Sequence, residues 1–210
     1  MPNGQEILSK YIPEQAVENI WMFFQTHSDL ELKITRKRNT KLGDFRMLSG
    51  KGYRISVNYN LNPYQFLLTL LHEMAHYLAY KKFGRRIKPH GREWKLIFGG
   101  LITEYIELLA FPEELIPILK KYAQNPKAST NGDGELFLRL SGYDKDRDER
   151  MKYVFQLTEG SLFSMENGSL FKLQEKRRTR YKCINLKNNR SYLVHQNALV
   201  YPINNLTNEK

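Results

Sequence analysis

The chain has 210 residues, of which 41% are hydrophobic and 26% charged, and its formal net charge is +11. This composition excludes a wholly disordered chain, and the single cysteine, Cys183, excludes a disulfide framework and any zinc site built from several thiolates. No apolar run approaches the roughly 18 residues that cross a bilayer, and the first residues lack a secretory signal pattern, so we expect a cytoplasmic protein with no membrane partner.

The first part of the chain predicts one helix followed by three strands. Residues 13–27 place apolar side chains at helical spacing, behind a proline that suits the first turn of a helix. Residues 31–36 and 53–59 alternate between apolar and polar side chains, and 42–48 lies between two turn-forming segments. We therefore expect three strands, of which 53–59 has the clearest pattern.

A long helix follows these strands. Asn62 suits its N-cap, Pro63 its first position and Gly84 its end, so the helix is expected to run through Phe83. Further helices are expected from about Gly91 to Leu109 and over 112–123. The apolar side chains expected on the buried stripe of the long helix are Phe66, Leu67, Leu70, Leu71, Met74 and Leu78.

The composition changes after Asn125. Proline, serine, asparagine and glycine gather there, and the residues just before position 151 are almost all charged. We expect an α+β domain over 1–125, a linker over 126–150 and a small β-rich module over 151–210. The strands expected in that module are 152–157, 161–165, 169–174, 179–184 and 191–195.

His72, Glu73 and His76 form an HExxH sequence within the long helix. The i, i+4 spacing puts both imidazoles on one face, about 6 Å apart at Cβ, so both can reach one metal ion. Catalytic zinc is held by three protein ligands and keeps a fourth position open, where water becomes a usable nucleophile. Glu73 can take a proton from that water. The alternative is a buried helix with two hydrogen-bonded histidines.

The third ligand is left open by the spacing alone. Glu104 and Glu107 on the next helix are candidates. His90 is favoured, because Gly84 reverses the chain and the six residues from 85 to 90 can span up to roughly 20 Å, enough to return to the metal. The alternative for His90 is an exposed histidine in a loop.

Several segments together resemble the SprT-like metallopeptidase family, which includes the Spartan proteases. They are residues 72–76, 83–86 and 90–95, preceded by 41–46 and 53–58, which look like the strands before that family's zinc helix. The resemblance covers about residues 10–125. It implies a zincin-like α+β fold, with helices packed on a small antiparallel sheet.

The resemblance also implies a function. It assigns His72, His76 and His90 as ligands of one Zn²⁺ and Glu73 as general acid/base. The best-understood relatives cleave proteins crosslinked to DNA and are stimulated by DNA. Many relatives carry a C-terminal ribbon with four cysteines, whereas this chain has only Cys183, so we expect no second zinc.

Positive charge is concentrated in three segments. Residues 33–54 hold eight lysines and arginines against one acid, 81–95 hold seven against one, and 172–190 hold eight against one. Aromatic residues lie in and around the last segment, a mixture that suits single-stranded DNA bound without sequence specificity. The alternative is a solvated strand face with aromatic side chains in a small core.

These patterns favour a zinc metalloendopeptidase that acts on DNA-associated or DNA-crosslinked proteins. Strand 53–59 is expected to offer an open edge to an extended substrate. The first alternative is a DNA-binding protein with a structural zinc, and the second is a peptidase unrelated to nucleic acid. The sequence predicts no oligomeric state.

Overall fold

The structure is a computed structural model that describes residues 4–38, 40–50, 52–129, 134–144 and 148–203. The chain divides into two compact units, residues 1–145 and 146–210. Each unit has its own hydrophobic core.

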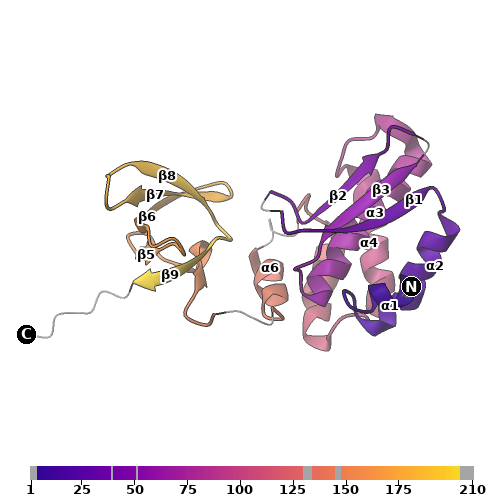
Figure 1. The fold of residues 1–210 in the computed structure, drawn as a ribbon, viewed down its shortest axis with the longest axis horizontal. Coiled ribbons are helices and arrows are strands. Elements are labelled where there is room, and N and C mark those ends of the chain that lie inside the picture. The colour runs from indigo at the N-terminus through magenta and orange to yellow at the C-terminus, as the bar shows by residue number, and fades with distance from the viewer. Residues whose placement is uncertain (1–3, 39, 51, 130–133, 145–147, 204–210) are drawn as a thin grey trace, which may run out of the picture. The chain divides into compact units, whose positions relative to one another are not determined.

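The N-terminal unit contains a three-stranded sheet of β1 (Leu30–Thr35), β2 (Gly43–Met47) and β3 (Tyr53–Asn58). The strand order is β1-β3-β2; β3 runs parallel to β1 and antiparallel to β2 (Figure 1). The expectation of an antiparallel sheet is therefore wrong. A short turn joins β2 and β3 into an antiparallel hairpin. The loop after β1 instead passes the end of β3 and reaches the far edge of the sheet. As a result, β1 and β3 lie side by side and run in the same direction.

This strand order also corrects the expected substrate edge. Because β3 is central, both of its edges are already paired, and strand 53–59 offers no open edge. The edge strand on that side is β2. The Leu42 carbonyl accepts the Asn58 N–H at 2.9 Å and the Leu48 N–H reaches the Gly52 carbonyl, so even-numbered residues pair with β3. The backbone groups of Gly43, Phe45 and Met47 therefore point to the open edge.

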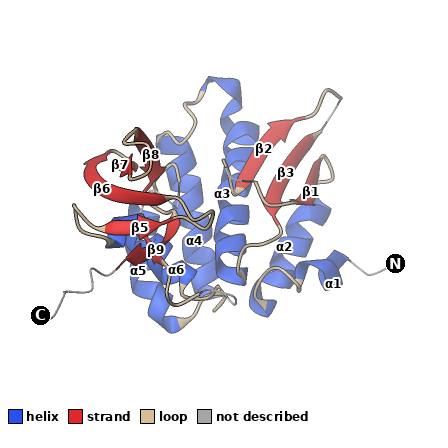
Figure 2. Ribbon diagram, turned by 60° about the vertical axis from the view of Figure 1, so that its left-hand side comes forward, coloured by secondary structure: helices blue, strands red, loops and turns tan. Residues whose placement is uncertain are grey.

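The long helix α3 (Pro63–Phe83) has the bounds that the sequence predicts. The Asn62 side chain accepts the Gln65 N–H at 3.0 Å, Pro63 occupies the first turn, and Gly84 ends the helix at φ +74°. Figure 2 shows α3 between the sheet and α4 (Arg92–Glu107), so it is buried on two sides. The hydroxyl of Tyr77 and the ammonium of Lys81 both bind the Asp29 carboxylate, which ties α3 to the turn before β1.

The other helices complete the core of this unit. α2 confirms the first predicted helix, and the predicted helix over 112–123 is a 3₁₀ turn continued by α5. Their apolar side chains join those of α3, β3 and α4 in one cluster. The bounds are α1 (Gly4–Leu8), α2 (Glu14–Thr26), η1 (Gly84–Arg86), η2 (Glu113–Leu115) and α5 (Ile116–Gln124).

One helix, α6 (Gly134–Ser141), lies inside the segment 126–150 that the composition predicts to be a linker. Its Leu136 and Leu140 are buried in the core of the N-terminal unit. The Asn62 side chain donates to the Leu140 carbonyl at 2.9 Å, which fixes α6 beside the start of α3. The apolar spacing of Leu136 and Leu140 outweighs the turn-forming residues that precede it.

The C-terminal unit is a six-stranded sheet of order β4-β9-β5-β6-β7-β8, in which every pair is antiparallel. Its core includes Phe163, Leu173 and the fully buried Cys183. The bounds are β4 (Lys152–Tyr153), η4 (Val154–Gln156), β5 (Leu162–Ser164), β6 (Leu170–Arg177), β7 (Arg180–Asn185), β8 (Ser191–His195) and β9 (Leu199–Ile203).

Two strand predictions fail in this unit. The predicted strand 152–157 is a two-residue strand followed by a 3₁₀ turn, and the sequence analysis missed β9. Pro202 argues against a strand at β9, because proline has no backbone N–H to donate to a neighbouring strand. None of the helices in the described residues is long and apolar enough to cross a membrane.

Candidate metal centre

Three histidines that are far apart in sequence meet at one point of the N-terminal unit. His72 and His76 lie one turn apart on α3, and His90 lies in the turn between η1 and α4. Their Nε2 atoms are 3.2 Å (His72 to His76), 3.0 Å (His76 to His90) and 3.2 Å (His72 to His90) apart. A tetrahedral zinc with ordinary Zn–N bonds needs ligand nitrogens about 3.3–3.4 Å apart. The three side chains are therefore positioned to bind one metal ion.

The turn that carries His90 holds a left-handed residue. His90 itself has φ +58°, a region that few residues other than glycine adopt but in which histidine is enriched. The Gly91 N–H closes the turn on the Lys88 carbonyl at 2.9 Å, and α4 begins directly afterwards. Such a backbone conformation, next to two convergent imidazoles, is typical of a residue held for function.

The acidic alternatives for a third ligand are not at this point. Glu104 and Glu107 are exposed on α4. Among the described residues, the group that could hold a metal consists of His72, His76 and His90.

Burial keeps the histidines neutral. Desolvation, followed by the neighbouring imidazoles, lowers the pKa of His72 to about 2, and the same causes lower the pKa of His76 to about 4. Desolvation also lowers the pKa of His90. A metal binds only the neutral imidazole, so burial prepares these nitrogens to coordinate an ion at neutral pH.

Trp94 is the platform beneath the three rings. Its side chain is fully buried, and its ring centroid lies 4.7 Å from His72, 5.2 Å from His76 and 4.7 Å from His90. Its indole N–H donates to the His72 carbonyl at 3.4 Å. Trp94 therefore packs α4 onto α3 and contacts all three histidines.

Glu73 points from α3 toward the sheet. It is 7% exposed, and desolvation raises its pKa to about 8, with the charge of Asp44 as the next cause. The positive charge of Arg38, a hydrogen bond from the Phe45 backbone and the charge of Lys41 act in the opposite direction. Glu73 follows His72 in the chain, and its carboxylate is a buried base in contact with β2.

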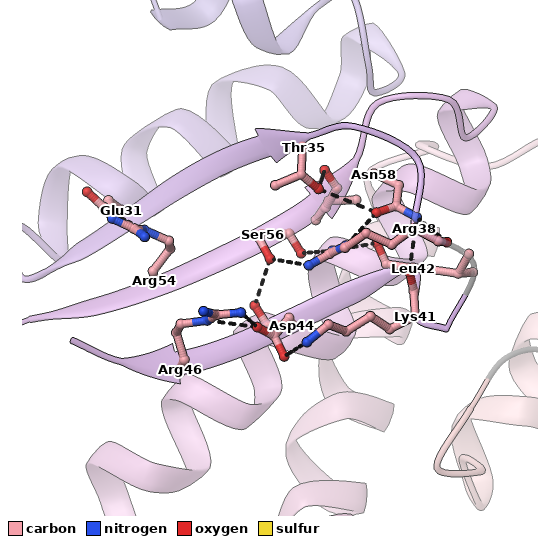
Figure 3. A network of polar contacts seen from close by, with 11 residues as sticks. Glu31, Thr35, Arg38, Lys41, Leu42, Asp44, Arg46, Arg54, Ser56 and Asn58 are labelled. Atoms are coloured by element: carbon pink, nitrogen blue, oxygen red, sulfur yellow. Dashed lines mark hydrogen bonds and ion pairs between the residues drawn. The ribbon is translucent and has the colours of Figure 1, made fainter. Parts of the chain in front are cut away.

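A polar network closes the outer side of the sheet next to β2 (Figure 3). The Arg38 guanidinium donates to Asn58 Oδ1 at 2.8 Å and to Ser56 Oγ at 2.9 Å. The Asn58 amide returns hydrogen bonds to the carbonyls of Arg38 and Lys41. The network fixes the loop that leads into Gly43.

Comparison with known proteins agrees with this geometry. Residues 15–105 match the model of the SprT-like family. This segment is similar to the SprT-like family. The segment contains the three histidines, Glu73, Trp94 and the Arg38 network.

Several similar curated proteins are called Protein SprT. Those of Pseudomonas fluorescens (strain SBW25) and Pseudomonas aeruginosa (strain LESB58) are 50% identical over 44 residues, and that of Pseudomonas savastanoi pv. phaseolicola is 48% identical over 44 residues. Each match spans 20% of this chain and 27% of the relative. No solved structure matches.

The sequence predicts the three histidines of this site but not the groups that surround them. The structure brings together His72, His76 and His90, as the sequence predicts. It adds Arg38 and Gly43, which the sequence analysis did not single out. A glycine at the start of a predicted strand is the signal that was present, since such a glycine often marks a close approach of another segment.

Proposed function

We propose that the SprT-like domain is a zincin-like, zinc-dependent metalloendopeptidase that acts on DNA-associated or DNA-crosslinked proteins. The observation that carries the proposal is the convergence of three imidazole nitrogens within 3.0–3.2 Å of one another, with Glu73 next to His72 in the chain.

The donor set supports zinc in an open site. Three neutral imidazoles are ligands that zinc accepts, and three protein ligands leave a tetrahedral ion with one position free. Structural zinc sites are usually closed by four protein ligands, so this set favours catalysis. When bound, such an ion activates water and polarises a carbonyl group.

Glu73 supplies the proton transfers in this proposal. Its carboxylate takes a proton from the attacking water and gives it to the nitrogen of the leaving amine. A general base works best when its pKa is near the working pH, and burial raises the pKa of Glu73 in that direction.

The open edge of β2 provides a place for the substrate backbone. The N–H and C=O groups of its odd-numbered residues point away from β3. The Phe45 N–H is bound to Glu73, and the groups of Gly43 and Met47 can pair with an extended segment of a target protein. This role belongs to β2, in place of the strand that the sequence suggested. Main-chain pairing reads no side chains, which suits a peptidase that accepts varied proteins.

Two basic surfaces support a DNA partner, which we propose to be single-stranded and bound without sequence preference. In the N-terminal unit, Lys33, Arg36 and Lys37 are exposed at the end of β1. In the C-terminal unit, β6 and β7 expose a run of cations in which Arg177 lies opposite Arg180. Tyr192 on β8 is 42% exposed and adds an aromatic face.

The test is cleavage of a DNA-binding protein, with and without single-stranded DNA, by wild type and Glu73→Gln. Zinc content should stay at one per chain in both, while cleavage disappears in the variant. Glu107→Gln, an exposed position on α4, is the matched control and should cleave like wild type. If wild type binds DNA and zinc but cleaves nothing, a DNA-binding protein with a structural metal replaces the proposal.

A further inference from the structure

The start of β2 and the side chain of Glu73 are packed so closely that a side chain at position 43 would have to displace its neighbours. A Cβ atom added to Gly43 would lie 2.5 Å from Glu73 Oε1 and 2.8 Å from Glu73 Cγ. It would also lie 2.8 Å from the Thr69 methyl, one turn earlier on α3. Gly43 has an ordinary strand conformation, so close approach, and not backbone freedom, is what requires a glycine here.

The same strand holds the carboxylate from a second point. The Phe45 backbone N–H, which points to the open edge of β2, donates a hydrogen bond to Glu73. Gly43 and Phe45 lie on one face of the strand because side chains alternate. The place of the carboxylate is therefore defined by close packing at Gly43 and by a backbone hydrogen bond at Phe45.

The loop before Gly43 is fixed from the other side of the sheet. The Leu42 carbonyl accepts hydrogen bonds from the Asn58 N–H at 2.9 Å and from Arg38 Nη2 at 3.3 Å. Ser56 and Asn58, which hold the Arg38 guanidinium, are only 3% and 1% exposed. A planar guanidinium can reach these groups and the Leu42 carbonyl together, which a lysine ammonium cannot do. We define Arg38, Leu42, Ser56 and Asn58 as the clamp.

We propose that Gly43 and Arg38 are positioning residues for the base of the reaction: Gly43 leaves the space that the Glu73 carboxylate occupies, and the clamp holds Gly43 against it. The proposal rests on the proposed peptidase function. Neither residue touches the reacting atoms. Both set where the carboxylate stands, and a misplacement of about 1 Å can cost a catalytic group about a hundredfold in rate.

Gly43→Ala tests the first half. The shortest contact of the new methyl is with the far end of the flexible Glu73 side chain, and the Thr69 methyl must also shift, so the variant is expected to fold with the carboxylate displaced. The kcat for protein cleavage should fall about tenfold or more, with KM and zinc content unchanged. Gly100→Ala on α4, where an added Cβ meets nothing within 4 Å, should leave kcat unchanged. Unchanged kcat in Gly43→Ala would overturn the proposal.

Arg38→Lys tests the second half without adding an atom near Glu73. It keeps the positive charge but loses the fork that binds Asn58, Ser56 and Leu42, so kcat should again fall with KM and zinc content unchanged. Arg139→Lys, an exposed arginine on α6, is the control and should be fully active. A fully active Arg38→Lys would overturn the role of the clamp, whatever Gly43→Ala does.

A stability measurement separates this inference from the proposed function. In metal-free protein, Gly43→Ala should lower the urea midpoint more in wild type than in a Glu73→Ala background. The second background keeps Thr69 but lacks the Glu73 side chain, which makes the shortest contact with the methyl. Equal shifts in both backgrounds would overturn the contact. If wild type loaded with zinc cleaves no protein, the peptidase proposal fails, while this difference in midpoints still decides whether Gly43 and Glu73 are coupled.

Discussion

Trp94→Ala removes the side chain on which all three histidine rings rest. The indole is fully buried and contacts the rings at centroid distances of 4.7–5.2 Å. An indole buries about 200 Å², worth about 5 kcal/mol at about 25 cal/mol per Å², and replacing a buried tryptophan by alanine typically costs about 3–5 kcal/mol. We therefore expect the free energy of unfolding to fall by about 3–5 kcal/mol.

Changes at Trp94 should also weaken metal binding, because the indole holds the three histidine rings in place. Residues that orient metal ligands typically contribute about 10–100-fold in affinity. Chelator competition should show about a tenfold loss of zinc affinity in Trp94→Phe, which keeps an aromatic ring but loses the N–H bonded to the His72 carbonyl.

Urea denaturation followed by circular dichroism measures the stability. Trp21→Ala on α2 is the control for zinc affinity and should bind zinc like wild type. In the described part of the chain, Trp21 is not among the rings that pack on the histidines. A loss below about 1 kcal/mol in Trp94→Ala, or zinc affinity unchanged in Trp94→Phe, would refute the view that Trp94 is their platform.

Three further predictions concern other parts of the molecule. Asn62→Ala removes the cap of α3 and the bond to the Leu140 carbonyl, so urea denaturation should show a loss of about 1–3 kcal/mol. In metal-free protein, burial raises the pKa of Glu73 from 4.5 to about 8. Between these pH values the folded state binds more protons than the unfolded chain, so the free energy of unfolding falls as the pH rises. In thermal melts, Glu73→Gln should therefore be as stable as wild type near pH 4 and more stable near pH 8. Arg180→Glu on β7 should weaken single-stranded DNA binding in salt titrations, whereas Lys152→Glu on β4, at the other end of the sheet, should not.

Local sequence signals predicted the elements that carry the histidines. Asn62, Pro63 and Gly84 mark the ends of α3 because capping depends on neighbouring residues only. The spacing of His72 and His76 places them on one face for the same reason. The sequence also showed that the six residues from 85 to 90 are enough to bring His90 back to the other two histidines. The structure places its Nε2 atom within 3.0–3.2 Å of the Nε2 atoms of His72 and His76.

Contacts between distant segments were not predictable in this way. The order β1-β3-β2 depends on where the loop after β1 crosses the sheet, and hydrogen bonds between Arg38 and Asn58 hold that loop. The need for glycine at position 43 arises from a side chain thirty residues later. α6 was missed because its two buried leucines follow a segment rich in turn-forming residues.

The central claim is that three imidazoles hold one catalytic ion, and metal analysis of the purified chain tests it most directly. We expect one zinc per chain in wild type and in a His195→Ala control on β8, and its loss in each of His72→Ala, His76→Ala and His90→Ala. Zinc retained at full stoichiometry in His90→Ala, in protein whose circular dichroism matches wild type, would contradict the account.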